Sequence, residues 1–133
     1  YTIGGKEIWT SLPEDPFSQS FMKESVKKNI MLHTLFDATA KGQIQNLKKY
    51  PNVTYRFLPE KYSSPTAIDI YGDRVLLYVG DNLDKPDKNM TIFMMVSKDL
   101  ADSYRKWFQF MWDHSTSLAV NNAKETPKTK KRG

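Results

Sequence analysis

Apolar and polar positions follow strand spacing over two short runs in the middle of the chain, residues 66–71 and 74–79. Only Gly72 and Asp73 separate the two runs. Two β-forming runs joined by such a pair predict a β-hairpin, and glycine in the first loop position favours a type II′ turn. A proline precedes the first run and a glycine follows the second, as expected at strand ends. The hairpin is the element around which we place the rest of the chain.

Before the hairpin, apolar runs alternate with runs of helical spacing. We expect strands at 6–12, 30–36 and 53–58, and helices at 17–28 and 38–50. Asn29 follows the first helix and is expected to end it. The order strand, helix, strand, helix, strand is typical of parallel strands joined by crossover helices.

After the hairpin, residues 90–96 form the most apolar run of the chain. We predict a central strand that is covered on both faces. Ser97 then suits a helix N-cap, with Asp99 in the first turn. A helix from Leu100 to Ser115 carries a stripe of large side chains, which we interpret as core rather than as a ligand site. The stripe comprises Tyr104, Trp107, Phe108, Met111 and Trp112.

The predicted fold class is α/β, with a mixed, mostly parallel sheet of about six strands, a central hairpin and flanking helices. Residues 1–120 form one domain in this prediction, since 133 residues are enough for one core. Residues 121–133 contain no large apolar side chain and are predicted to be a disordered tail. The chain starts on Tyr1 rather than methionine, so we expect it to be a piece of a longer protein.

The formal net charge of +5 is concentrated in the predicted tail. Residues 121–133 hold five basic side chains and one glutamate, a balance of +4, which leaves about +1 for the domain. Contact with nucleic acid through the tail is therefore one possible function, and it would show steep salt dependence. The basic residues that would carry it are Lys128, Lys130, Lys131 and Arg132.

Composition limits the chemistry that this chain can perform. It has no cysteine, which excludes disulfides and thiolate metal sites. His33 and His114 have no second ligand at metal-binding spacing, so we expect no metal and no cofactor. Phosphate-binding glycine loops and a nucleophile elbow are absent from the sequence. No apolar run approaches the ~20 residues that span a bilayer, and we expect a cytoplasmic protein without a membrane partner.

Polar residues at the predicted strand ends are the candidates for ligand binding. In open α/β sheets, ligands bind outside the carboxyl ends of parallel strands. The alternative is that these side chains only end strands and cap helices. The candidates at that edge and on the hairpin are Thr10, Ser11, Asp37, Thr66, Asp69 and Asp73.

The hairpin resembles the His-x-Lys-x-x-x-x-Asp motif of the phospholipase D superfamily. Thr66 stands at the position of the histidine, Ile68 at that of the lysine and Asp73 at that of the aspartate, and residues 80–82 follow where the family has a Gly-Ser segment. Threonine and isoleucine cannot replace a phosphorus nucleophile and a phosphate-binding cation. The resemblance therefore implies a phospholipase D-like fold without catalysis, and a residual phosphodiesterase or nuclease is the alternative.

A larger part of the chain, residues 6–116, is similar to the C-terminal sensor domain of TrmB-like archaeal transcriptional regulators. The similarity includes residues 6–9, 70–75 and 97–101, followed by the aromatic helix with Trp107-Phe108 and Met111-Trp112. It implies a regulatory domain that binds a small-molecule effector, forms a homodimer, or both. It also implies a winged helix-turn-helix, absent from these residues, as the part that contacts DNA.

Overall fold

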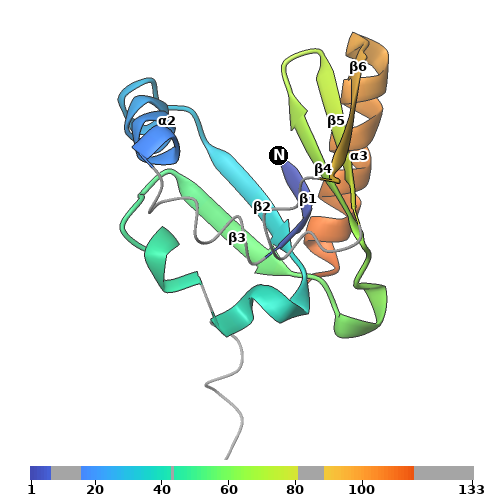
Figure 1. Cartoon of the computed structure of the whole chain (residues 1–133), viewed down its shortest axis with the longest axis horizontal. Helices are drawn as coiled ribbons and strands as arrows, with labels where there is room; N and C mark the ends of the chain where they lie inside the picture. The colour runs from blue at the N-terminus through green and yellow to red at the C-terminus, as the bar shows by residue number, and fades with distance from the viewer. Residues whose placement is uncertain (7–15, 43, 81–88, 116–133) are drawn as a thin grey trace, which may run out of the picture.

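The computed structural model describes residues 1–6, 16–42, 44–80 and 89–115 and shows an α/β fold (Figure 1). Six strands form one mixed sheet in the order β3-β2-β1-β4-β5-β6. The strands are β1 (Thr2–Gly5), β2 (Leu32–Phe36), β3 (Val53–Phe57), β4 (Thr66–Tyr71), β5 (Arg74–Val79) and β6 (Thr91–Val96). The helices are α2 (Pro16–Lys27) and α3 (Lys98–Asp113), with 3-10 helices η2 (Ala38–Gly42), η3 (Ile44–Leu47) and η4 (Glu60–Tyr62). The α/β class and the six-stranded mixed sheet agree with the sequence-based prediction.

The hairpin forms as predicted. Strands β4 and β5 pair along their full length, from Thr66 opposite Val79 to Tyr71 opposite Arg74, which leaves a two-residue loop. Gly72 has a φ of +55°, whereas Asp73 keeps a negative φ. Glycine with positive φ in the first loop position alone is the pattern of a type II′ turn.

The prediction that the sheet is mostly parallel is wrong. Only the β1–β2 and β2–β3 pairs are parallel, whereas β1–β4, β4–β5 and β5–β6 are antiparallel. A parallel pair needs a crossover connection, and only the first half of the chain provides such connections. From β4 onward successive strands are neighbours in the sheet and run in opposite directions, with a two-residue loop between β4 and β5 and residues 80–90 between β5 and β6.

The first strand lies earlier than predicted. It covers Thr2–Gly5, and Lys6 already follows it, whereas the rest of the predicted strand 6–12 lies outside the described residues. Gly4 has a φ of +72°, and the pairing register with β2 shifts between Ile3 and Gly5. A Cβ on Gly5 would lie 2.9 Å from both the Phe36 ring and the Thr34 methyl group. Two glycines thus allow β1 to bulge and to lie close against its neighbour.

Helix α2 ends as predicted, and its end is fixed to β3. Asn29 adopts the left-handed conformation with a φ of +54°, a common helix terminator. The side-chain amide of Asn52 donates to Ser25 Oγ and to the carbonyl oxygen of Ile30, both at 2.8 Å. The predicted apolar stripe is only partly buried, because Met22 is covered whereas Phe17 is 80% exposed. The predicted helix at 38–50 forms as the two short 3-10 helices η2 and η3.

Apolar side chains form a core on each face of the sheet. Leu35 belongs to the core under α3, together with Ile3, Ile70, Val75, Ala101 and Phe108. The next residue, Phe36, belongs to the second core with Phe57 and the apolar side chains of η2 and η3. Successive strand residues point to opposite faces, so β2 contributes to both cores. Among the described residues, no helix is long and apolar enough to cross a membrane.

Helix α3 begins at the predicted cap and lies against β4 and β5. Ser97 Oγ accepts a hydrogen bond from the backbone N–H of Leu100 at 3.3 Å. The prediction of a core aromatic stripe is right for Phe108, whose burial stabilises the fold by about 1.5–3 kcal/mol. It is wrong for Trp107, which is 54% exposed.

Strand β6 is not the central strand that its apolar sequence predicts. It is the last strand of the sheet, and its only partner in the described part of the chain is β5. Five of its six residues are exposed, and only Met95 is half-buried. Helix α3 packs mainly against β4 and β5, and Met95 is the β6 side chain that packs against the core under this helix.

Candidate functional site

A buried ion pair lies at the carboxyl ends of β1 and β2. Lys6 follows β1 and Asp37 follows β2, and because these strands are parallel neighbours their ends meet at one edge of the sheet. The Lys6 ammonium group donates to Asp37 Oδ2 and to the carbonyl oxygen of Ser64. Lys6 is 4% and Asp37 is 2% exposed. The remaining carboxylate oxygen, Asp37 Oδ1, is buried and has no hydrogen-bond partner among the described residues.

Strand β4 brings Thr66 to the same edge from the other side of β1. Because β4 is antiparallel to β1, its first residue lies near the carboxyl end of β1. The hydroxyl groups of Thr66 and Ser64 are 2.9 Å apart, and Ser64 Oγ also accepts from the Thr66 backbone N–H at 3.2 Å. Two hydroxyl groups therefore stand beside the buried Lys6–Asp37 pair, which contacts Ser64 directly.

These groups border a pocket of about 400 Å³ between the sheet edge and the carboxyl end of α3. Its described polar side chains are Asp37, Tyr62, Ser64, Thr66 and His114. Its apolar lining includes Ile3, Leu58, Pro59, Ile68, Phe110 and Met111. Apolar walls with a few convergent polar groups are typical of a small-molecule site, and this volume suits a ligand of metabolite size.

His114 presents one defined nitrogen at the α3 side of the pocket. Its Nδ1 lies 2.7 Å from the carbonyl oxygen of Phe110 and donates to it, because a carbonyl can only accept. In the neutral imidazole, Nε2 is then an acceptor. The pocket thus combines a carboxylate, which only accepts, with a ring nitrogen and with hydroxyl groups that both donate and accept.

Asp69, a predicted ligand residue, lies in a different place with both carboxylate oxygens occupied. Thr2 Oγ1 donates to Oδ1 at 2.6 Å, and the Tyr78 hydroxyl donates to Oδ2 at 2.9 Å. Burial, followed by the charge of Asp69 and their hydrogen bond, raises the pKa of Tyr78 well above its ordinary value. This cluster joins β1, β4 and β5, and its hydrogen bonds indicate a structural role.

The other predicted ligand residues do not join the pocket in the described structure. Asp73 lies in the exposed hairpin turn, 3.4 Å from Arg74, at the opposite end of β4 from Thr66. Thr10 and Ser11 lie outside the described residues, as do the predicted tail and its basic residues Lys128, Lys130, Lys131 and Arg132. Of the four predicted ligand residues that the structure describes, Asp37 and Thr66 therefore lie at one site, whereas Asp69 and Asp73 lie elsewhere.

The sequence-based prediction missed Lys6 and His114 as members of the site. Lys6 was placed inside a strand, so its position beside Asp37 at a strand end could not be anticipated. The signal that could have found it is Gly4-Gly5, which predicts a break before the lysine. His114 was interpreted as structural, because nothing local shows that the end of α3 reaches the carboxyl edge of the sheet.

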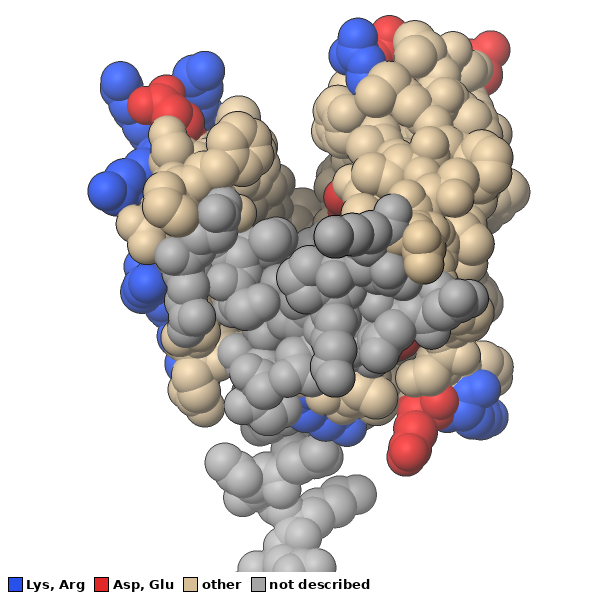
Figure 2. All heavy atoms as spheres, viewed as in Figure 1, with Lys and Arg blue, Asp and Glu red and all other residues tan. Residues whose placement is uncertain are grey.

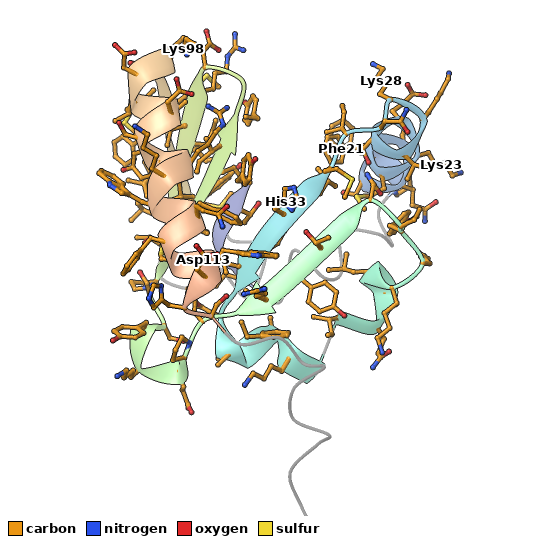
Figure 3. All side chains as sticks on the ribbon, turned by 180° about the vertical axis from the view of Figure 1, so that it is seen from behind. Phe21, Lys23, Lys28, His33, Lys98 and Asp113 are labelled. Atoms are coloured by element: carbon orange, nitrogen blue, oxygen red, sulfur yellow. The ribbon has the colours of Figure 1, made fainter. Side chains whose placement is uncertain are left out.

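His33 occupies an aromatic cluster rather than the pocket, on β2 and facing α3 (Figure 3). Its ring stacks on Tyr1 at 5.2 Å and meets Trp112 edge-on at 6.0 Å, and its Nδ1 is 2.6 Å from Thr54 Oγ1. Burial, more than any neighbouring charge, lowers the pKa of His33. No group of three potential metal ligands occurs within the described ranges.

Comparison with known proteins gives no relative that would assign this site. No protein-family model matches the chain, and no curated protein and no solved structure shows significant similarity to it. The TrmB-like and phospholipase D-like resemblances therefore stay predictions, and the pocket geometry is the basis for assigning a function.

Proposed function

We propose that this chain is a ligand-sensing domain that binds a small molecule in the pocket at the carboxyl ends of β1 and β2. The observation that carries the proposal is Asp37, a buried carboxylate that lines an apolar pocket with one oxygen left unpaired among the described residues. An unpaired buried acceptor costs about 1–3 kcal/mol, and a ligand donor that reached this oxygen through a small shift of the lining side chains would recover this free energy. Lys6 holds the carboxylate in place from the other side.

The lining defines the chemical class of the ligand. Asp37 as a carboxylate only accepts hydrogen bonds, and the hydroxyl groups of Ser64 and Thr66 can accept as well as donate. The polar end of the ligand should therefore carry at least one hydroxyl or ammonium donor. The apolar walls contributed by β1, β4 and α3 suit a hydrocarbon or aromatic body. A compact alcohol or amine with an apolar body fits both features.

The resemblance to phospholipase D-like domains supports a binding role instead of catalysis. Thr66 and Ile68, which stand at the motif positions of histidine and lysine, both line the pocket. In this proposal, the catalytic groups of a phosphodiesterase site have been replaced and its cavity binds an effector. Asp73, the third motif residue, is at the far end of β4, so no observation favours the residual phosphodiesterase.

The regulatory context follows from the same resemblance. As a relative of TrmB-like sensor domains, the pocket would report an effector to a DNA-binding winged helix-turn-helix outside these 133 residues. Helix α3 is suited to transmit occupancy, because Phe110 and Met111 line the pocket while Ala101 and Phe108 pack in the core. An effector that contacts the end of α3 could therefore shift this helix relative to the sheet.

Thermal-shift screening of the full chain against alcohols, polyols and amines tests the proposal. We expect a donor-bearing compound to raise the melting temperature, and NMR chemical shifts to change at Asp37, Thr66 and His114. Thr66→Val removes the hydroxyl group and keeps the side-chain shape, so it should weaken binding, and Thr66→Ser should restore it. The absence of any hit, or shift changes confined to residues away from the pocket, would refute the assignment.

A further inference from the structure

Strand β6 ends the sheet with apolar side chains on both of its faces. Phe93 pairs with Leu77, which pairs with Ile68 of the core under α3, so Phe93 lies on the α3 side. Ile92 and Met94 point to the other side. Phe93 is 53% and Met94 is 58% exposed. Over β4, β5 and β6 the surface in view is almost free of charged residues except at its ends (Figure 2).

The free edge of β6 lacks the features that usually protect an edge strand. Its sequence TIFMMV contains no charge and no proline, and no strand in the described part of the chain pairs with its outer side. Natural proteins commonly use lysine, proline or a covering element at such edges. The opposite edge strand, β3, carries Arg56, which lies over the Trp112 ring at 4.9 Å, and the 3-10 helices cover its other face. As far as the described residues go, protection is thus present at the β3 edge and missing at the β6 edge.

We propose that the β6 edge pairs antiparallel with the β6 edge of a second copy of this chain, which forms a continuous twelve-stranded sheet. This inference is independent of the ligand pocket, because no residue of β6 lines it. Antiparallel pairing of two identical edges requires a twofold axis perpendicular to the sheet. Such an axis keeps each face on its own side, so both α3 helices lie on the same face of the dimer.

The register follows from this symmetry. Residues on the α3 face of one copy must pair with residues on the α3 face of the other. When Phe93 lies on the twofold axis, the apolar run 90–96 of one copy pairs along its full length with the same run of the other. Phe93 then faces its own counterpart, Ile92 faces Met94, and Met90 faces Val96. Every pair except Thr91 with Met95 joins two apolar side chains, and such cross-strand pairs stabilise a sheet by about 0.2–1 kcal/mol each.

Helix α3 adds an exposed ring on the β6 side. Trp112 contacts His33 and Arg56 and thus faces β2 and β3. Trp107 lies five residues earlier, about 140° round the helix, so helix geometry puts it on the flank of α3 away from β2 and β3. Because α3 lies over β4 and β5, its axis is roughly 10 Å from the twofold axis at the usual strand spacing. The two helices would be about 20 Å apart, too far for direct packing, and Phe93 and Trp107 of both copies would fill the space.

The exposed apolar area along this edge sets the upper limit of what these side chains can bury in the dimer. At their exposed fractions of 39–61%, the six large side chains along this edge present roughly 100 Å² each, or about 600 Å² per copy. A standard interface buries about 800 Å² per partner, and the backbone of the paired strands would add to the apolar area. The six are Met90, Ile92, Phe93, Met94, Val96 and Trp107.

A second copy fits this edge better than a charged or polar partner. A run that is apolar on both faces is typical of a strand with neighbours on both sides and cover on both faces. In the dimer β6 becomes one of the two central strands and gains both neighbours. A partner strand with alternating polar residues would place polar side chains beside the apolar residues on one face of β6, whereas a second β6 places apolar side chains beside apolar ones on both faces.

Sedimentation equilibrium of the full chain, with and without a lysine on β6, tests the proposal. We expect the wild-type chain to be a dimer and Met94→Lys to shift it to a monomer with at least a tenfold weaker association. Phe17→Lys is the matched control, because Phe17 is more exposed, at 80%, and lies on α2. It should leave the dimer intact. A wild-type monomer at all concentrations, or dissociation by Phe17→Lys alone, would overturn the proposal.

Disulfide trapping tests the register and does not depend on the stability of a charged variant. The chain has no cysteine, so Phe93→Cys introduces a single thiol at the proposed axis. Directly opposed residues have Cα atoms about 4.5–5.5 Å apart, within reach of a disulfide. We expect Phe93→Cys to form a covalent dimer on mild oxidation and Phe17→Cys to form none. Crosslinking at residue 17 and not at residue 93 would place the interface elsewhere.

Discussion

Replacing Lys6 by methionine should strongly destabilise the fold, because it leaves a carboxylate buried without its cation. Asp37 is 2% exposed, and its second oxygen has no hydrogen-bond partner among the described residues. Removing one partner of a buried ion pair costs about 3–5 kcal/mol. For a chain with a urea m-value of ~2 kcal/mol/M, the unfolding midpoint should fall by about 2 M.

The double variant Lys6→Met/Asp37→Leu separates the free-energy contribution of the ion pair from the contribution of the packing of either side chain. Replacing both members of a buried pair by apolar residues of similar volume is often neutral, so the double variant should be more stable than Lys6→Met alone. Urea unfolding followed by far-UV circular dichroism gives the free energy of unfolding for each variant. The double-mutant cycle should show a coupling free energy of about 2–3 kcal/mol.

An exposed ion pair provides the control for this experiment. Lys98 and Asp102 are 2.6 Å apart near the start of α3, with side chains that are 79% and 43% exposed. Lys98→Met should cause no measurable change, since water screens such a pair. If Lys6→Met were as mild as Lys98→Met, or if the double variant were no more stable than Lys6→Met, the reasoning about the buried pair would be refuted.

Three further predictions concern single residues. Burial and the charge of Asp69 raise the pKa of Tyr78, so the folded chain keeps the phenol proton at a higher pH than the unfolded chain does. The free energy of unfolding should therefore fall as the pH rises above about 10. Tyr78→Phe should reduce the fall in melting temperature that the wild-type chain shows above about pH 10. An equal fall in the variant would contradict this assignment. Gly5→Ala places a Cβ 2.9 Å from the Phe36 ring and should cost about 1–3 kcal/mol in urea unfolding, whereas a neutral result would show that β1 can move away. Ser97→Ala removes the cap of α3 and should cost about 1 kcal/mol by the same assay, with Ser97→Asp expected to retain most of the stability.

Features that depend on a few neighbouring residues could be predicted from the sequence. The turn at Gly72, the helix end at Asn29 and the cap at Ser97 are all set by the local backbone preference of one residue. Strand partners are set by contacts between distant segments, and the mostly parallel sheet was wrong for this reason. The first strand was misplaced because Thr2–Gly5 contains one large apolar residue and two glycines, which give a weak strand pattern.

The candidate site likewise contains residues that local sequence could predict and residues that depend on distant contacts. Asp37 and Thr66 could be predicted because Asp37 follows a strong strand pattern and Thr66 begins one. Polar residues at strand ends lie together at one edge of the sheet. Asp69 was selected by the same reasoning, but its position inside β4 gives it partners on β1 and β5 instead. Lys6 was missed because its partner is 31 residues away in the chain. No local pattern indicates which buried lysine meets which aspartate.

The misplacement of β6 has a different cause, since its apolar run predicted a central strand covered on both faces, whereas the structure places it at the edge of the sheet. Hydrophobic periodicity indicates that a strand is buried in its functional state, and it does not indicate whether the covering atoms belong to the same chain. Within one copy β6 is an exposed edge, which conflicts with its composition. In the proposed dimer the same strand lies at the centre of twelve, with partners on both sides and Phe93 and Trp107 rings on the α3 face. The disagreement between pattern and position is then itself an argument that the folded unit contains two copies of the chain.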